Sequence, residues 1–213
     1  MKFYATTPLQ PDIKPSSIVF LLHGWGADGR DLLSIADAWK QDFPDTLFVC
    51  LEAPQVCEAN PFGFQWFSLG DMSEDTLKEG VISARQGVHD VIHSILQQQQ
   101  VEPGNVVIMG FSQGMMMALS VGLRQEKPFA GILGYSGALA DAEDNLPETY
   151  PKPDICLIHG EADSVIPVSM HQHSVDWLKT HQYSVESLRI PGLPHGIDMQ
   201  ALEKGREFLK KCL

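Results

Sequence analysis

The chain has 213 residues, of which 44% are hydrophobic and 20% are charged, with 18 Gly and 14 Pro. This composition is typical of a globular protein with a sizeable core, and it excludes a disordered, collagen-like or coiled-coil chain. The 15 Lys and Arg against 27 Asp and Glu give a formal net charge of −12, so we expect no nucleic-acid partner.

Short apolar runs rich in β-forming residues recur along the chain. Residues 2–6 are a candidate edge strand, and continuous apolar runs follow at 17–22, 46–51, 105–109, 129–133 and 155–158. Continuous runs are typical of strands that are buried on both faces, as in a parallel sheet covered by helices. The segment 184–190 alternates between apolar and polar residues instead, which indicates a strand at the edge of the sheet.

Helical patterns lie between these strands. Apolar residues step by three and four from Leu77 to Ile95, which predicts a helix over residues 73–98. Three further helices are predicted around 116–123, over 168–181 and from Asp198 onward. The alternation predicts one α/β domain over residues 1–213, with a mostly parallel central sheet and helices on both faces.

The segment 53–75 does not follow this alternation. It is rich in turn-forming residues, yet it carries the aromatic residues Phe62, Phe64, Trp66 and Phe67. Long loops inside compact domains are uncommon and often functional. The segment is therefore either a lid or groove wall, or a loop whose aromatic side chains anchor it to the body of the protein.

Several features indicate a cytoplasmic protein. The N-terminus lacks the apolar segment of a secretory signal, and no run approaches the ~18 apolar residues of a membrane span. The four cysteines form no C-x-x-C pair, and Cys50 and Cys156 lie in apolar runs where free thiols pack as small hydrophobic groups. Free thiols are typical of a reducing compartment.

The motif Gly110-Phe-Ser-Gln-Gly114 follows a predicted strand and precedes a helical pattern. A serine on such a sharp turn has little space two residues before and after it, and glycine at both places lets the turn expose the hydroxyl above the sheet. The spacing predicts Ser112 as a nucleophile.

A serine hydroxyl needs a base to take its proton and a carboxylate to orient that base. His195 and Asp163 each follow a predicted strand, and the carboxyl ends of parallel strands gather functional groups. Glu161, two residues before Asp163, is the alternative carboxylate. Five other histidines lie on helical segments and are interpreted as surface or partly buried residues: His89, His93, His171, His173 and His181. Because His171 and His173 are two positions apart and point in different directions on a helix, no metal site is expected.

Acyl transfer also needs two donors for the oxyanion of the tetrahedral intermediate. Gln113 follows the predicted nucleophile and supplies one backbone amide. The glycine-rich turn in Leu21-Leu-His-Gly-Trp-Gly-Ala-Asp28 follows the first long strand and supplies the second, for which Trp25 is the candidate.

Four motifs together, L-H-G-W-G-A-D, G-F-S-Q-G, H-G-E-A-D-S-V-I-P and P-H-G, resemble the small carboxylesterase/phospholipase family that includes the acyl-protein thioesterases. The resemblance covers the chain from Ile18 to the C-terminal helix. It implies a minimal α/β-hydrolase fold and hydrolysis of esters or thioesters of acyl chains without a cofactor. The 213 residues leave no room for a separate cap domain, and homodimers occur in the family, which makes a homodimer one candidate assembly. The carried-over roles are a catalytic triad of Ser112, Asp163 and His195, oxyanion-hole amides of Trp25 and Gln113, and a substrate groove near Trp66.

The sequence departs from the family pattern at three positions. Trp25 stands where the family usually has Leu, Met115 where it commonly has Gly, and Ser68 where it usually has Asp. These changes affect the expected acyl-chain preference, for which Phe64, Trp66 and Met115 are the candidate groove residues. The alternative to an esterase is a non-catalytic module of the same fold that binds an acyl ligand or a protein.

Overall fold

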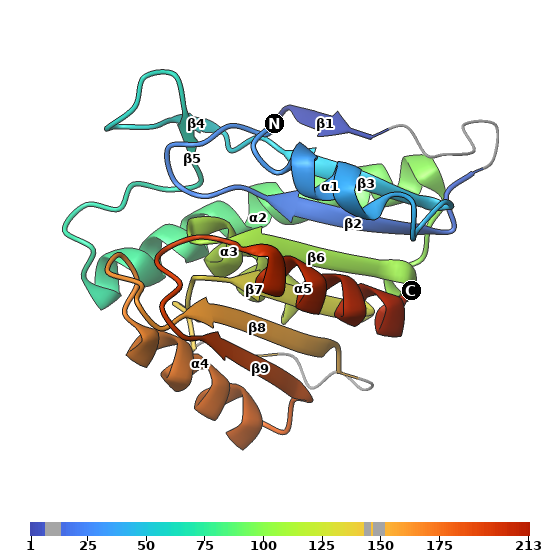
Figure 1. Ribbon diagram of the computed structural model, residues 1–213. Helices are drawn as coiled ribbons and strands as arrows, with labels where there is room; N and C mark the ends of the chain where they lie inside the picture. Colours follow the sequence, from blue (N-terminus) through green and yellow to red (C-terminus); the bar gives the residue numbers. More distant parts are fainter. Residues whose placement is uncertain (7–13, 143–145, 147–151) are drawn as a thin grey trace.

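The computed structural model describes residues 1–6, 14–142, 146 and 152–213. Within these residues a seven-stranded sheet has the order β1-β3-β2-β6-β7-β8-β9, shown in Figure 1. β1 pairs antiparallel with β3, and every other neighbouring pair is parallel. The predicted mostly parallel sheet is therefore confirmed. The strands are β1 (Phe3–Ala5), β2 (Ser17–Leu22), β3 (Thr46–Leu51), β6 (Val106–Phe111), β7 (Gly131–Tyr135), β8 (Asp154–Gly160) and β9 (Val185–Ile190).

Helices cover both faces of this sheet (Figure 1). Ile18, Phe20 and Leu22 of β2 belong to one core cluster, together with buried residues of the helices α2 (Glu74–Gln99), α3 (Gln113–Gly122) and α4 (Val168–Thr180). Val19 and Leu21 point to the other face and share a cluster with α1 (Leu33–Trp39) and α5 (Met199–Cys212). Since side chains alternate along a strand, the continuous apolar run of β2 supplies both layers of the core.

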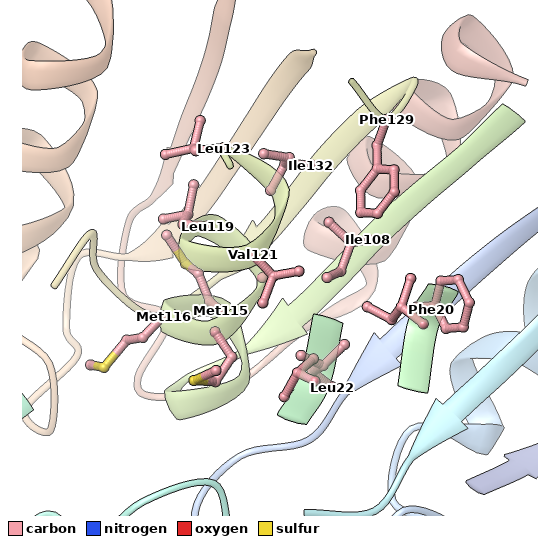
Figure 2. Packing of buried hydrophobic residues seen from close by; sticks show 14 of the residues in the cluster. Phe20, Leu22, Ile108, Met115, Met116, Leu119, Val121, Leu123, Phe129 and Ile132 are labelled. Atoms are coloured by element: carbon pink, nitrogen blue, oxygen red, sulfur yellow. The ribbon is translucent and has the colours of Figure 1, made fainter. Parts of the chain in front are cut away.

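The helix α3 lies in the middle of the core, and all ten of its residues are buried. Figure 2 shows Met116, Leu119 and other side chains of this helix beside residues of β2 and β6. Burying each large apolar side chain contributes roughly 1.5–3 kcal/mol to folding. The packing therefore fixes the first turn of α3 at the carboxyl edge of the sheet, where the G-F-S-Q-G motif ends.

Most predicted elements are found close to their expected bounds. β6 and β7 begin one and two residues later than the apolar runs, and α5 begins after Asp198, whose side chain accepts a hydrogen bond from the backbone N–H of Ala201. The helix α1 was not predicted, although Leu32, Ile35, Ala36 and Trp39 have helical spacing and are buried. A seven-residue helix without a side-chain cap gives a weak signal in the sequence. A short 3-10 turn, η1 (Pro103–Asn105), precedes β6.

The segment 53–75 contains a small hairpin in place of an uninterrupted loop. β4 (Gln55–Val56) pairs antiparallel with β5 (Phe64–Gln65) beyond the main sheet (Figure 1). Trp66 and Phe67, directly after the hairpin, are 0% and 2% exposed. For Trp66 and Phe67 this burial agrees with the interpretation in which aromatic side chains anchor the segment to the body, whereas Phe62 is 90% exposed and does not anchor it.

The buried positions expected for Cys50 and Cys156 are confirmed. Cys50 and Cys156 are free and buried, and burial raises the pKa of each thiol to about 12. Among the described residues, the helices are all too short or too polar to cross a membrane.

Candidate active site

Ser112 lies on the tight turn between β6 and α3. Its φ of 54° and ψ of −118° are a conformation that side chains rarely adopt, as expected for a serine held on a strained strand-to-helix turn. The two flanking glycines have no space for a side chain. A β-carbon on Gly110 would lie 2.1 Å from the carbonyl oxygen of Gly114, and one on Gly114 would lie 2.0 Å from the carbonyl oxygen of Leu22. The motif is therefore a steric requirement of this turn.

The structure brings Ser112, His195 and Asp163 together. His195 Nε2 lies 3.0 Å from Ser112 Oγ, and His195 Nδ1 lies 2.8 Å from Asp163 Oδ2. Because the carboxylate can only accept, Nδ1 carries the ring proton and leaves Nε2 free to accept a proton from the serine. The three side chains are thus linked in the order that a nucleophile, its base and an orienting carboxylate require.

Asp163 follows β8, and its carboxylate is buried. Oδ1 accepts hydrogen bonds from the backbone N–H groups of Val165, at 2.8 Å, and Ile166, at 2.9 Å, while Oδ2 faces His195. The alternative carboxylate, Glu161, is exposed and lies 3.5 Å from the side chain of Arg189. Of the two carboxylates, only Asp163 reaches His195.

Close contacts between two loops bring His195 to this place. A β-carbon on Gly160 would lie 2.1 Å from the carbonyl oxygen of Leu193, and the backbone N–H of Ala162 donates to the same oxygen at 3.0 Å. The ring of Phe111, next to the serine, lies 4.9 Å from the ring of His195 between centroids. The loop after β9 is therefore held against the ends of both β8 and β6.

The two predicted oxyanion amides are available. Among the described residues, neither the backbone N–H of Trp25 nor that of Gln113 has a hydrogen-bond acceptor. The side chain of Gln113 has a second function that the sequence did not reveal. It accepts from the backbone N–H of Trp66 at 2.9 Å and donates to the carbonyl oxygen of Phe67 at 2.8 Å. These bonds fix the start of α3 against the segment that follows the hairpin.

The side chain of His23 stabilises the turn that carries Trp25 through two hydrogen bonds. Its Nε2 accepts from the backbone N–H of Ala53 at 3.1 Å, so Nδ1 carries the proton and donates to the carbonyl oxygen of Gly24 at 2.7 Å. Burial lowers the pKa of His23, which favours the neutral ring that this arrangement needs. The indole N–H of Trp66 donates to the carbonyl oxygen of His23 at 2.8 Å. The glycine-rich turn is thereby tied to two other segments.

The prediction for the substrate groove needs correction. Trp66 and Met115 have no exposed surface. The indole N–H of Trp66 donates to the carbonyl oxygen of His23, and the Met115 sulfur accepts from the backbone N–H of Gly137 at 3.1 Å. They pack in the core and do not form the wall of an open groove. Phe64 is half-buried.

A cavity of about 650 Å³ lies beside the candidate site instead. Two of its lining residues, Ala138 and Leu139, directly follow Gly137 in the chain. Gly137 packs closely against Ser112, because a β-carbon on this glycine would lie 2.6 Å from the carbonyl oxygen of Ser112. Its other described lining residues come from the start of α2, from α4 and from the segment after β7: Glu74, Asp75, Leu77, Lys78, Ala140, Ala142, Ser169, Met170, His173 and Trp177. The sequence did not reveal this cavity, because its walls come from three separate segments.

One histidine interpretation is wrong. His171 is not a surface residue but is completely buried, with Nε2 2.9 Å from the hydroxyl oxygen of Ser187. Burial lowers its pKa to about 4. The ring of His159 lies 5.2 Å from that of His171, and burial lowers its pKa as well. Two buried neutral histidines are therefore adjacent: His159 lies against Asp163, and His171 lies against His159.

Comparison with known proteins gives consistent results. Residues 9–213 match the family described as Phospholipase/Carboxylesterase. The sequence is 28% identical to an acyl-protein thioesterase 1 of Gibberella zeae, with 93% of this chain and 91% of the relative covered. It is 27% identical to the esterase YpfH of Escherichia coli, with 94% and 84% covered. The crystal structure of the esterase PE8 superposes with a TM-score of 0.93 at 33% identity, covering 99% of this chain and 98% of the other.

Proposed function

Since this chain belongs to the phospholipase/carboxylesterase family, we propose that it hydrolyses carboxylic esters and thioesters of acyl chains, with Ser112 as the nucleophile. The observation that carries the assignment of residues is the continuous contact from Ser112 Oγ through His195 to the buried carboxylate of Asp163, at 3.0 Å and 2.8 Å. The esterases and thioesterases among its relatives support the class of reaction.

The mechanism follows from these contacts. Ser112 Oγ attacks the carbonyl carbon of the substrate while His195 Nε2 accepts the hydroxyl proton. Asp163 holds the ring and stabilises the imidazolium that forms. The negative charge on the former carbonyl oxygen is stabilised by the backbone N–H groups of Trp25 and Gln113, and each such donor lowers the barrier by roughly 3 kcal/mol.

The tetrahedral intermediate collapses when the bond to the leaving group breaks. His195 returns its proton to the departing alcohol or thiol, which leaves the acyl group on Ser112. Water then attacks the acyl-enzyme, with His195 as the base again, and releases the carboxylic acid. The reaction needs no group beyond these side chains and amides.

The cavity beside Ala138 and Leu139 is the proposed place for the acyl chain. Its apolar residues Leu77, Met170 and Trp177 suit a hydrocarbon chain, and its volume of about 650 Å³ is within the range of small-molecule sites. We propose acyl esters and thioesters, including those of acylated proteins, as substrates. The net charge of −12 favours neutral or cationic acyl carriers over strongly anionic ones.

Two further proposals concern the cellular context. The free, buried cysteines support a cytoplasmic protein. All proposed site residues lie within the one α/β sheet and its connections, which supports a single domain in which loops select the substrate. Self-association as a homodimer remains a prediction, to be checked by light scattering during gel filtration.

Covalent labelling tests the nucleophile. The wild type is incubated with a fluorophosphonate probe and its intact mass is measured. We expect one adduct, and none on Ser112→Ala. An unlabelled, folded wild type would contradict the proposed function. Labelling of Ser112→Ala to the same extent would show that another residue is the nucleophile.

Turnover separates an esterase from a module that only binds acyl ligands. We expect hydrolysis of p-nitrophenyl butyrate by the wild type and a loss of several orders of magnitude in kcat for His195→Ala. Comparing a short ester, a lysophospholipid and a palmitoylated peptide then identifies the preferred class of substrate. A wild type that binds these compounds without hydrolysing any of them would favour the binding module.

A further inference from the structure

His159 is a buried histidine that directly contacts the turn carrying Asp163. It lies near the end of β8 and has no exposed surface. Its Nε2 is 2.9 Å from the carbonyl oxygen of Ile166 and 3.4 Å from Asp163 Oδ2. Since the carbonyl oxygen of Ile166 can only accept, Nε2 carries the ring proton and donates to it. The same N–H group lies close to the Asp163 carboxylate without a hydrogen bond to it.

The same turn is closed by the hydrogen bonds of Ile166. Its backbone N–H donates to Asp163 Oδ1 at 2.9 Å, and its carbonyl oxygen receives the N–H of His159. The ring of His159 therefore lies against the carboxylate and bonds to Ile166, the residue whose backbone N–H holds that carboxylate. Asp163 Oδ2 also lies 2.8 Å from His195 Nδ1.

We propose that His159 is a positioning residue that fixes the Asp163 carboxylate for its contact with His195, an inference that rests on the proposed function. Its N–H holds the carbonyl oxygen of Ile166, while the backbone N–H groups of Val165 and Ile166 hold Asp163 Oδ1. Orienting groups behind a catalytic side chain set the geometry on which the reaction depends.

The surroundings of His159 keep it neutral, and a neutral ring suits this role. The titratable groups that face it are Asp163 on its own loop, His195 on the loop after β9 and His171 on α4. Burial lowers the pKa of His159, and among the described residues its Nδ1 has no partner that would stabilise a second ring proton. A neutral ring holds the turn of Asp163 through Ile166 without neutralising the negative charge that His195 needs.

Three variants of His159 separate positioning from simple packing. His159→Leu fills the buried space with an apolar side chain but removes the N–H that donates to the carbonyl oxygen of Ile166. His159→Gln returns an N–H close to the position of Nε2, whereas the amide of His159→Asn ends near the position of Nδ1 and falls short of both acceptors. His171→Leu is the matched control, because it removes a buried histidine of the same cluster that does not touch Asp163.

The readout is the pH dependence of kcat and kcat/KM for p-nitrophenyl butyrate. For His159→Leu and His159→Asn we expect kcat to fall on the order of tenfold with KM changed by less than about twofold. The acid limb of the profile should move up by about 0.5 pH unit, because a carboxylate that loses a nearby N–H dipole is more basic and stabilises the protonated His195 more strongly. His159→Gln should restore kcat to within about threefold of the wild type, and His171→Leu should leave the acid limb in place.

The proposal is overturned if folded His159→Leu and His159→Asn keep the wild-type kcat and acid limb, or if His171→Leu produces the same changes. If His159→Leu does not fold, the comparison of His159→Gln with His159→Asn decides in the same way. A wild type that is not labelled on Ser112 would contradict the proposed function instead, so the two failures are distinguishable.

Discussion

The backbone of Gly114 packs so closely against Leu22 that a β-carbon on the glycine would lie 2.0 Å from the carbonyl oxygen of the leucine. This contact joins the first turn of α3, which follows Ser112, to the end of β2, which leads into the turn of Trp25. The distance between the proposed nucleophile and the proposed oxyanion amide of Trp25 therefore depends on a backbone contact that only glycine permits.

Gly114→Ala should disrupt both stability and activity. One of the two backbones must move to accept the methyl group, and we expect a loss of about 3 kcal/mol in the free energy of unfolding, or about 8 °C in Tm. The rate of labelling by the fluorophosphonate probe should fall at least about a hundredfold. Thermal melts and labelling kinetics measure the two effects. A stable variant with the wild-type rate of labelling would show that this contact is not a constraint.

Gly87→Ala is the matched control and should stabilise the protein. Gly87 is exposed within α2, and a β-carbon there would meet nothing within 4 Å. Alanine is more favourable than glycine inside a helix by roughly 0.5–1 kcal/mol, so Tm should rise by about 2 °C with unchanged kcat. A lower Tm would contradict the open surroundings of this position.

Trp25→Leu and Trp25→Pro separate the side chain from the backbone N–H at this position. Leucine keeps the amide, although it removes the indole bond to the Gln65 side chain at 2.9 Å, and kcat should stay within about fivefold of the wild type. Proline removes the N–H itself, and kcat should fall roughly 10²–10³-fold at similar KM. Circular dichroism confirms that both variants fold. Equal kcat values for the two variants would exclude this amide from the oxyanion hole.

Ala140→Phe should change the preferred length of the acyl chain. Ala140 is half-buried and lines the cavity beside the site, so a phenyl ring there reduces the space for a substrate. We expect kcat/KM for p-nitrophenyl octanoate and longer esters to fall about tenfold or more, with that for the acetate unchanged. Ile82→Phe, at an exposed position of α2, should affect neither. A uniform loss for all chain lengths would argue against an acyl site in this cavity.

His171 should make the folded protein less stable as the pH falls. Its pKa is lowered by burial to about 4 in the folded state, below the ordinary value of 6.5, so the unfolded chain binds the proton first. The contribution of His171 to the free energy of unfolding should therefore be constant above pH 6.5. It should decrease by up to about 3 kcal/mol as the pH falls towards 4. His171→Leu should flatten this dependence of Tm on pH.

The control for this prediction is His173→Gln. His173 is exposed on the same helix, so its replacement should leave the dependence of Tm on pH unchanged. The measurement is a series of thermal melts between pH 4.5 and 7.5. A wild type and a His171→Leu variant with parallel curves would show that His171 is protonated equally in both states.

The local sequence determined the type of sheet and the positions of the three proposed catalytic residues along the chain. The continuous apolar runs specified a parallel sheet, because such strands must be covered on both faces, and the position of Ser112 followed from glycines that its turn requires. Asp163 and His195 could be proposed because both follow strands, and parallel strands end at one edge of the sheet. The catalytic roles of these residues remain predictions for the variants above.

Only the tertiary structure decided which side chains face the cavity and which face the core. Met115 and Trp66 would be apolar whether they faced a cavity or the core. The sequence does not show that all of α3 is buried, or that the indole N–H of Trp66 donates to the carbonyl oxygen of His23. His171 has the same helical spacing as an exposed residue, yet it packs against His159 from a different element. Periodicity identifies one face of an element, whereas burial depends on what the rest of the chain places opposite that face.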